Sequence, residues 1–131
     1  MSNKLDKILA EISAGELFDK ITILEIKKEK ISNKEKLVEV EKELKSLNDI
    51  AEKFISDQSN IAKHINNLKE INLRLWDIEN GKRAAEKKKI FDDKFIELAR
   101  NVYKLNDERA KIKLVINTAL GSNIKEVKSY E

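Results

Sequence analysis

Two charged residues occupy positions in this sequence where apolar side chains would be expected. Asp19 lies in residues 11–31, a stretch with apolar side chains on two faces of a helical wheel, so we expect its carboxylate to be at least partly buried. Arg109 interrupts an otherwise aliphatic pattern near the end of the chain. A buried carboxylate requires a cation or hydrogen-bond donors, and a guanidinium can donate two parallel hydrogen bonds to it. We therefore predict that Asp19 pairs with Arg109, with Arg100 or Arg83 as alternative partners.

Other polar residues near this pair extend it into a candidate polar node. In one interpretation the node is a structural ion pair that fixes the register of packed helices. In the other, its side chains line a small pocket that binds an anion. The node comprises residues from the stretches GELFDK and NDERA, namely Glu16, Asp19, Lys20, Asn106, Asp107 and Arg109.

A second cluster, LWDIE, places a tryptophan and two acidic residues together. Trp76, Asp77 and Glu79 form a candidate surface for a protein partner. The flanking Leu75 and Ile78 belong to an apolar pattern, and indoles supply much of any small core, so we also expect Trp76 to be largely buried. An exposed Trp76 would instead favour the partner-binding role.

The residue types of the chain exclude several kinds of active site. There is no cysteine, which excludes thiolate nucleophiles, disulfides and cysteine-ligated metals. His64 is the single histidine, so one chain cannot supply a two-histidine metal site. The sequence has neither a glycine-rich phosphate loop nor a nucleophile elbow. We assign no catalytic residue, no metal and no cofactor, and we favour a non-enzymatic protein over an enzyme.

The charges of the chain are nearly balanced and interleaved. Its 131 residues include 27 basic and 24 acidic side chains, a pattern typical of solvated helix surfaces rather than of a nucleic-acid footprint. The one dense basic run, residues 82–89, is either a solvated helix end or a contact for RNA or an acidic partner, and few aromatics accompany it. No stretch is apolar and long enough for a signal peptide or a membrane span, so we expect a soluble cytoplasmic protein.

Serine residues mark the starts of the first helices. Ser13 and Ser32 are each followed three residues later by a glutamate. Such capping boxes predict one helix over residues 14–30 and another from residue 33 to about 57. Ser59 could cap a third helix, with either a polar end or a loose continuation after its apolar part.

The last part of the chain predicts one further helix, from about residue 91 to 120, with Gly121 as its stop. The helices leave residues 1–13 as an N-terminal arm and residues 122–131 as a C-terminal tail. We expect a single helical domain over residues 1–131, because no linker divides the chain.

Apolar residues in the last three helical segments alternate at spacings of three and four, which is the pattern of helices packed side by side. The first helix, apolar on two faces, should be sandwiched between neighbours. We predict an all-α fold, an elongated antiparallel helical bundle with coiled-coil-like heptad seams. Long apolar stripes with few aromatics favour self-association, so we expect a homo-oligomer, a dimer or larger. The predicted seams are Leu37, Val40, Leu44, Leu47, Ala51 and Phe54; Ile61, His64, Leu68, Ile71, Leu75 and Ile78; and Phe95, Leu98, Val102, Leu105, Arg109, Ile112, Ile116 and Ala119.

Four separated motifs resemble those of a small bacterial family, a domain of unknown function of about this length. They are SAGELFDKITILEIKKEKI, LWDIEN, FIELARNVYKLNDERAKIKLVIN and GSNIKEVKSY, in that order along the chain. The resemblance implies a cytoplasmic bacterial protein, with some members encoded near genes for cell-surface polysaccharides. The family pattern has acidic residues where this chain has Asn80 and Gly81, so no role is carried over to these two positions.

The sequence as a whole favours a non-enzymatic, self-associating scaffold or interaction module that has an unidentified protein partner. A small-anion-binding protein or an enzyme that uses the Asp19 and Arg109 pair is the alternative. An RNA-binding accessory protein is the third interpretation, although nucleic-acid binding is not what the charge pattern favours.

Overall fold

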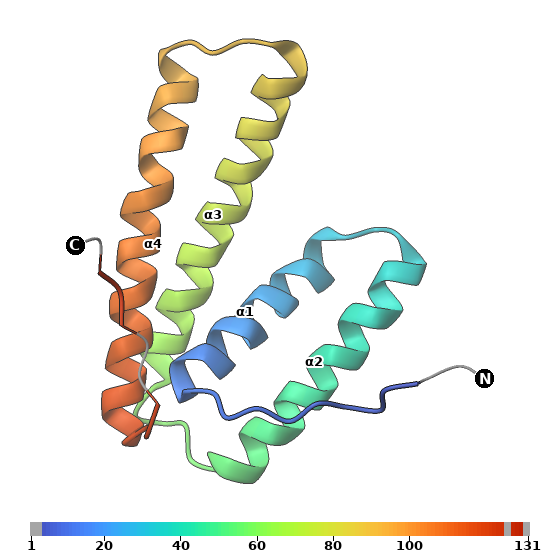
Figure 1. The fold of residues 1–131 in the computed structure, drawn as a ribbon, viewed down its shortest axis with the longest axis vertical. Helices are drawn as coiled ribbons and strands as arrows, with labels where there is room; N and C mark the ends of the chain where they lie inside the picture. The colour runs from blue at the N-terminus through green and yellow to red at the C-terminus, as the bar shows by residue number, and fades with distance from the viewer. Residues whose placement is uncertain (1–3, 125–126, 130–131) are drawn as a thin grey trace.

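The fold is an elongated, antiparallel helical bundle, as the sequence predicts (Figure 1). The computed structural model describes residues 4–124 and 127–129, and within these it contains helices and no strand. Tyr130, which the sequence assigns to the C-terminal tail, lies outside the described residues. The helices are α1 (Ala14–Lys30), α2 (Lys34–Phe54), α3 (Ala62–Lys88) and α4 (Asp93–Leu120).

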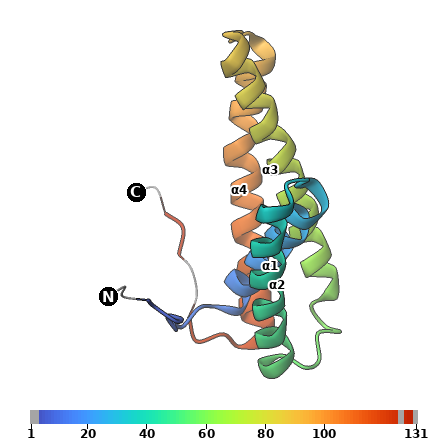
Figure 2. The ribbon, with the colours of Figure 1, turned by 90° about the vertical axis from the view of Figure 1, so that its right-hand side faces the viewer.

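The four helices form two hairpins, α1 with α2 and α3 with α4, and α1 lies at the centre. It packs against all three other helices, which confirms that its two apolar faces are both covered. Because α3 and α4 have 27 and 28 residues against 17 in α1, the α3–α4 hairpin extends well beyond α1 (Figures 1 and 2). No helix among the described residues is long and apolar enough to cross a membrane.

The start of α1 agrees with the sequence prediction, whereas the start of α2 differs from it by one residue. The Ser13 hydroxyl accepts a hydrogen bond from the Glu16 amide at 3.1 Å, as a helix N-cap does. At α2 the cap is Asn33, whose side chain accepts from the Lys36 amide at 3.0 Å. The prediction that Ser32 caps this helix is wrong, because the adjacent asparagine is an equally good cap and occupies the position before the first turn.

The other helix ends refine the predicted boundaries. Ser59 does not cap α3, because it donates its hydroxyl and its amide to the Asp57 carboxylate instead. The polar stretch after residue 78 is regular helix up to Lys88, so it is a continuation of α3. Asp92 caps α4, and Gly121 ends it with φ of 63°, the left-handed conformation that the sequence predicts there.

The apolar core lies where α1 meets α2 and the adjoining ends of α3 and α4. The predicted seams supply much of it, but Phe54 and Ala119 are exposed. Phe54 is 72% exposed because α2 ends at this residue, short of the predicted boundary near residue 57. The core cluster consists of Leu17, Phe18, Ile21, Leu24, Val40, Leu44, Ala51, Ile61, Leu68 and Ile116.

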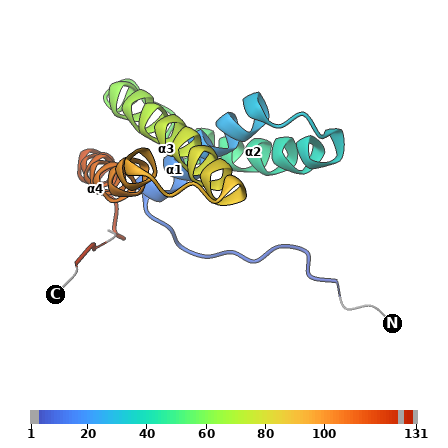
Figure 3. The same ribbon diagram turned by 90° about the horizontal axis from the view of Figure 1, so that it is seen from above.

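The N-terminal arm extends away from the bundle without helical structure (Figure 3). Its described part, residues 4–13, is exposed apart from Ser13 at the start of α1.

Candidate functional site

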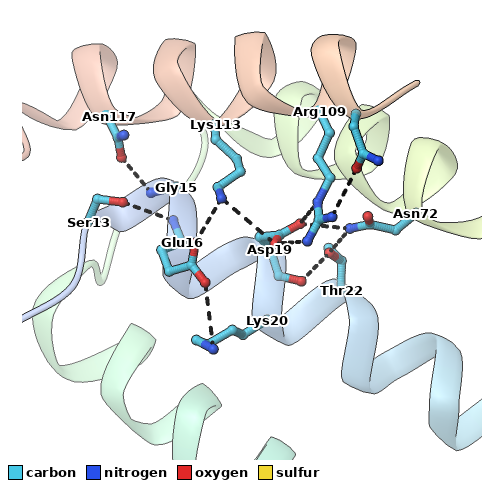
Figure 4. Close-up of polar contacts among 11 residues, drawn as sticks. Ser13, Gly15, Glu16, Asp19, Lys20, Thr22, Asn72, Arg109, Lys113 and Asn117 are labelled. Atoms are coloured by element: carbon cyan, nitrogen blue, oxygen red, sulfur yellow. Dashed lines mark hydrogen bonds and ion pairs between the residues drawn. The ribbon is translucent and has the colours of Figure 1, made fainter. Parts of the chain in front are cut away.

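Asp19 of α1 and Arg109 of α4 form a bidentate ion pair between the two helices (Figure 4). Arg109 Nε donates to Asp19 Oδ1 at 2.8 Å, and Nη2 donates to Oδ2. The Asp19 side chain is 2% exposed and the Arg109 side chain 28%. The pair predicted from the sequence is therefore present, and it closes a contact between residues 90 positions apart.

Asn72 brings α3 into the same network. Its side-chain amide donates to Asp19 Oδ1 at 3.0 Å and to the Thr22 hydroxyl oxygen at 3.1 Å. Thr22 in turn donates its hydroxyl to the backbone carbonyl of Asp19 at 2.9 Å. The Asp19 carboxylate thus holds three helices together through buried hydrogen bonds, which are stronger where the local dielectric is low.

Lys113, one helical turn after Arg109, connects the network to a second carboxylate. Its ammonium lies 2.8 Å from Glu16 Oε2 and 4.0 Å from Asp19 Oδ2, and its side chain is 7% exposed. Glu16 also faces Lys20 at 3.6 Å along the same helix. Positive and negative groups therefore alternate across the α1–α4 interface.

Two opposing effects act on the pKa of Asp19. Burial alone would raise it, but hydrogen bonds from Arg109 and Asn72 and the charges of Arg109 and Lys113 outweigh the burial. The result is a pKa below the ordinary value of 3.8, so Asp19 is ionised at neutral pH. An ionised, paired carboxylate of this kind stabilises a fold and is not poised to transfer protons near pH 7.

Gly15 allows the first turn of α1 to lie directly against α4. Its amide donates to Asn117 Oδ1 at 2.6 Å. A Cβ at this position would lie 2.5 Å from the Lys113 carbonyl oxygen and 2.9 Å from Asn117 Oδ1, so a larger residue would push the helices apart. Asn117 Nδ2 is buried and has no hydrogen-bond partner within the described residues.

A cavity of about 470 Å³ lies beside the network, on the side where the C-terminal tail passes. Glu16, Asp19 and Arg109 line it together with Lys128 of the tail. Lys128 pairs with Asp107 at 2.8 Å, which ties the tail to α4. The cations that face this cavity are matched by carboxylates, so it has the character of a neutralised interface.

The structure brings together five of the six residues predicted for the polar node. Asn106 joins them through its side-chain oxygen, which accepts from Arg109 Nη1 at 3.3 Å. Asp107 pairs instead with Lys128 of the tail, which lines the same cavity. Sequence reasoning missed Asn72 and Lys113. Lys113 was detectable, because it follows Arg109 by four residues and so lies on the same helix face.

Of the candidate partner surface at Trp76, Asp77 and Glu79, only two residues lie together. Trp76 is half-buried, which corrects the expectation that it is largely buried: α3 here is covered by α1 on one side and open on the other. Trp76 and Glu79 line a second cavity, whereas Asp77 is exposed and lies outside it. Among the described residues no group of three or more acidic, histidine or cysteine side chains could hold a metal ion.

Comparison with known proteins identifies a family but no characterised relative. A family model, described as a family of unknown function (DUF6165), matches residues 8–131. No curated protein and no solved structure matches the chain. The match covers the whole helical bundle and confirms the resemblance to a family of unknown function. The chain therefore belongs to DUF6165, a family of unknown function.

Proposed function

We propose that this protein is a non-enzymatic, self-associating helical interaction module, and that its N-terminal arm docks on a second copy of the chain. The observation that carries the proposal is the exposure of the arm. Leu5, Ile8 and Leu9 are 81%, 78% and 81% exposed, more than nearly every other large apolar side chain described. Three such side chains in one short segment form an apolar patch that a partner would cover.

The order of residues in the arm supports docking as a helix. Leu5, Ile8, Leu9 and Ile12 are spaced by three, one and three positions, which places them on one face of a helix. The arm is extended in the single chain, and a short helix gains most of its stability from a surface against which its apolar face can pack. A groove on a second copy would supply that surface.

A groove with matching chemistry lies at the root of the arm. It encloses about 640 Å³ and is lined mainly by apolar residues of α1, α2 and the C-terminal tail. Phe54 and Ile50 at its rim are 72% and 38% exposed. Residues 10–13 of the arm form part of the wall of this groove, so the arm begins beside it. If two copies exchanged arms, each arm would enter the groove of the partner. The side chains that would meet the arm are Leu17, Ile50, Phe54, Ile55 and Ile124.

The polar node gives less support to the alternative of anion binding. The two Arg109 nitrogens that face Asp19 are used in a bidentate pair, and Lys113 lies against Glu16. A site for an anion needs cationic groups that are not already neutralised by carboxylates. The node is therefore assigned to the stability of the bundle.

Light scattering after size exclusion at micromolar concentration tests the proposal. The wild type should have at least the mass of a dimer, and a clean monomer would contradict self-association. Burial of one leucine side chain contributes about 1.5–3 kcal/mol. Replacing Leu5 and Leu9 by serine should therefore raise the dissociation constant by about a hundredfold or more. Val38→Ser is the matched control, because Val38 is 62% exposed on α2 but does not line the groove.

A mixing experiment separates arm exchange from other modes of association. Phe54→Ser damages the groove and leaves the arm intact, whereas the double arm variant does the reverse. Each variant alone should be monomeric, because in a homodimer of either variant both arm–groove contacts contain the damaged element. Mixed in equal amounts, they should form a heterodimer that retains one intact contact. Dimers that persist in either variant alone, or a mixture that stays monomeric, would exclude arm exchange.

A further inference from the structure

A crevice between α1 and α3 differs in chemistry from the polar network beside it. Its volume is about 400 Å³, within the usual range for small-molecule sites. Ile23 and Ile26 of α1 and Leu75 of α3 form apolar walls. Arg109 of α4 also lines the crevice, and its guanidinium is held by Asp19. An apolar crevice with a few polar groups is the usual form of a ligand site.

Most of the polar groups of the crevice come from one stripe of α3, and Arg109 of α4 is the exception. Asn72, Trp76, Asn80 and Arg83 are spaced by four, four and three residues, so they follow one face of the helix. No hydrogen bond or ion pair joins the side chain of Trp76, Asn80 or Arg83 to another described residue. Arg83 therefore presents its guanidinium at the crevice without a carboxylate to neutralise it.

The balance of charge at the crevice favours an anion. Glu79 is the one acidic residue that lines it, and its carboxylate pairs with Lys82 at 3.4 Å. Arg109 is matched by Asp19. Arg83 is left as the uncompensated charge, and the basic run continues from it along α3 with Lys87 and Lys88. Such a surface attracts anions from solution and raises their local concentration.

We propose that this crevice binds a small organic anion that carries a flat ring, with the anionic group on Arg83 and the ring against Trp76. A guanidinium binds phosphate or carboxylate through paired hydrogen bonds. An indole face stacks on flat rings, and Asn80 offers an amide donor and acceptor for polar ring substituents. Phosphate and carboxylate share the chemistry that Arg83 recognises, so the two sources are separated by experiment.

Trp76 provides the measurement, because it is the single tryptophan of the chain. Its fluorescence is followed while adenosine 5′-monophosphate or benzoate is added to the full-length protein. A saturable change with the nucleotide identifies a phosphate ligand, and one with benzoate identifies a carboxylate ligand. Adenosine and inorganic phosphate, which carry the ring and the charge separately, should each bind at least tenfold more weakly than the nucleotide. The proposal is overturned if neither anion binds, or if adenosine binds as tightly as its monophosphate.

Variants at Arg83 and Lys87 test the site without touching the core. Arg83→Gln should weaken binding about tenfold or more, and Arg83→Lys should recover part of it. Lys87→Gln is the matched control, because Lys87 is exposed on the same helix, carries the same charge and does not line the crevice. Equal losses in Arg83→Gln and Lys87→Gln would reduce the effect to general electrostatics and overturn the proposal. Trp76→Leu, measured by equilibrium dialysis, should weaken binding of the nucleotide and leave binding of inorganic phosphate unchanged.

Discussion

The polar network at Asp19 and the crevice at Arg83 lie side by side, and they differ in whether their polar side chains are buried and hydrogen-bonded. Asn72 and Arg109 contribute to both. In the network, the carboxylate of Asp19 is 2% exposed and bonded from two helices. In the crevice, the side chains of Asn80 and Arg83 are exposed and make no such bonds. A buried polar group without partners destabilises a fold, whereas water satisfies an exposed one, so stability depends on the first region and ligand binding on the second.

Removal of the Asp19 carboxylate should produce the largest effect. Asp19→Ala removes the carboxylate that neutralises the half-buried Arg109 guanidinium, and loss of one member of such a pair costs about 3–5 kcal/mol of unfolding free energy. Urea denaturation measures the loss. In a double-mutant cycle of Asp19→Asn with Arg109→Gln, additivity within about 0.5 kcal/mol would show that the pair is not coupled.

Gly15→Ala should have the next largest effect, a loss of about 2 kcal/mol, because the added Cβ meets backbone that cannot move aside. Alanine favours helix formation over glycine, so a purely local effect would have the opposite sign. A stabilised variant in the same urea assay would therefore contradict the close approach of α1 and α4.

Protonation of Asp19 at low pH should remove part of the unfolding free energy that the Asp19→Ala substitution removes. Because the pKa of Asp19 is lowered in the folded state, its contribution is fully present above the unfolded pKa near 3.8 and is lost as pH falls through the lower folded value. Unfolding free energy should therefore decline below about pH 4, and less steeply in Asp19→Asn. The pKa of exposed Asp57 is also lowered, by hydrogen bonds from Ser59. Asp57→Asn is therefore the control that shows how much of the decline comes from a carboxylate outside the network. A decline of equal slope in wild type and Asp19→Asn would exclude Asp19 as its cause.

The N-termini of α1 and α2 show the same difference between polar side chains that make a hydrogen bond within the protein and those that do not. Ser13→Ala and Asn33→Ala should each cost about 1 kcal/mol, because each removes the acceptor for an amide of the first turn. Ser32→Ala should change stability by less than about 0.5 kcal/mol, since Ser32 is exposed and caps nothing. If Ser32→Ala lowered the urea midpoint more than Asn33→Ala, the assignment of Asn33 as the α2 cap would be wrong.

The smallest effect is expected at the crevice. Arg83→Gln should leave the unfolding free energy within about 0.5 kcal/mol of wild type, because the exposed guanidinium makes no intramolecular bond that could be lost. A loss above 1 kcal/mol in thermal or urea unfolding would mean that Arg83 supports the bundle, and the distinction between the two regions would fail.

Sequence reasoning was most reliable where one physical requirement left few solutions. The Asp19 and Arg109 pair was predictable because both residues interrupt apolar patterns and each needs an opposite charge. Asn72 was missed because the heptad pattern passes through Ile71 and does not show which helix face meets α1. The Ser32 and Asn33 ambiguity arises because both residues cap well, and only the path of the chain selects one.

Exposure depends on tertiary distances that periodicity does not contain. Phe54 belongs to a predicted apolar seam and Trp76 lies between two seam residues, yet Trp76 is half-buried and Phe54 is exposed. Phe54 is the last residue of α2, and Trp76 lies where α1 covers α3 on one side only. A seam read from the sequence therefore identifies the face of a helix and not the length over which a partner covers it.

The 90 residues between Asp19 and Arg109 have a consequence for how the protein is made. At about 5–20 residues per second, a ribosome that has completed Asp19 needs on the order of 5–20 s to add Arg109. During that interval α1 can pair with α2 through its apolar face, while the face that carries Asp19 stays hydrated. A chain that stops before α4 would lack Arg109 and Lys113, so this carboxylate would be bonded only by Asn72 of α3 and would stay without its cations. Truncated products of this protein should therefore be better substrates for proteases and chaperones than their length alone implies.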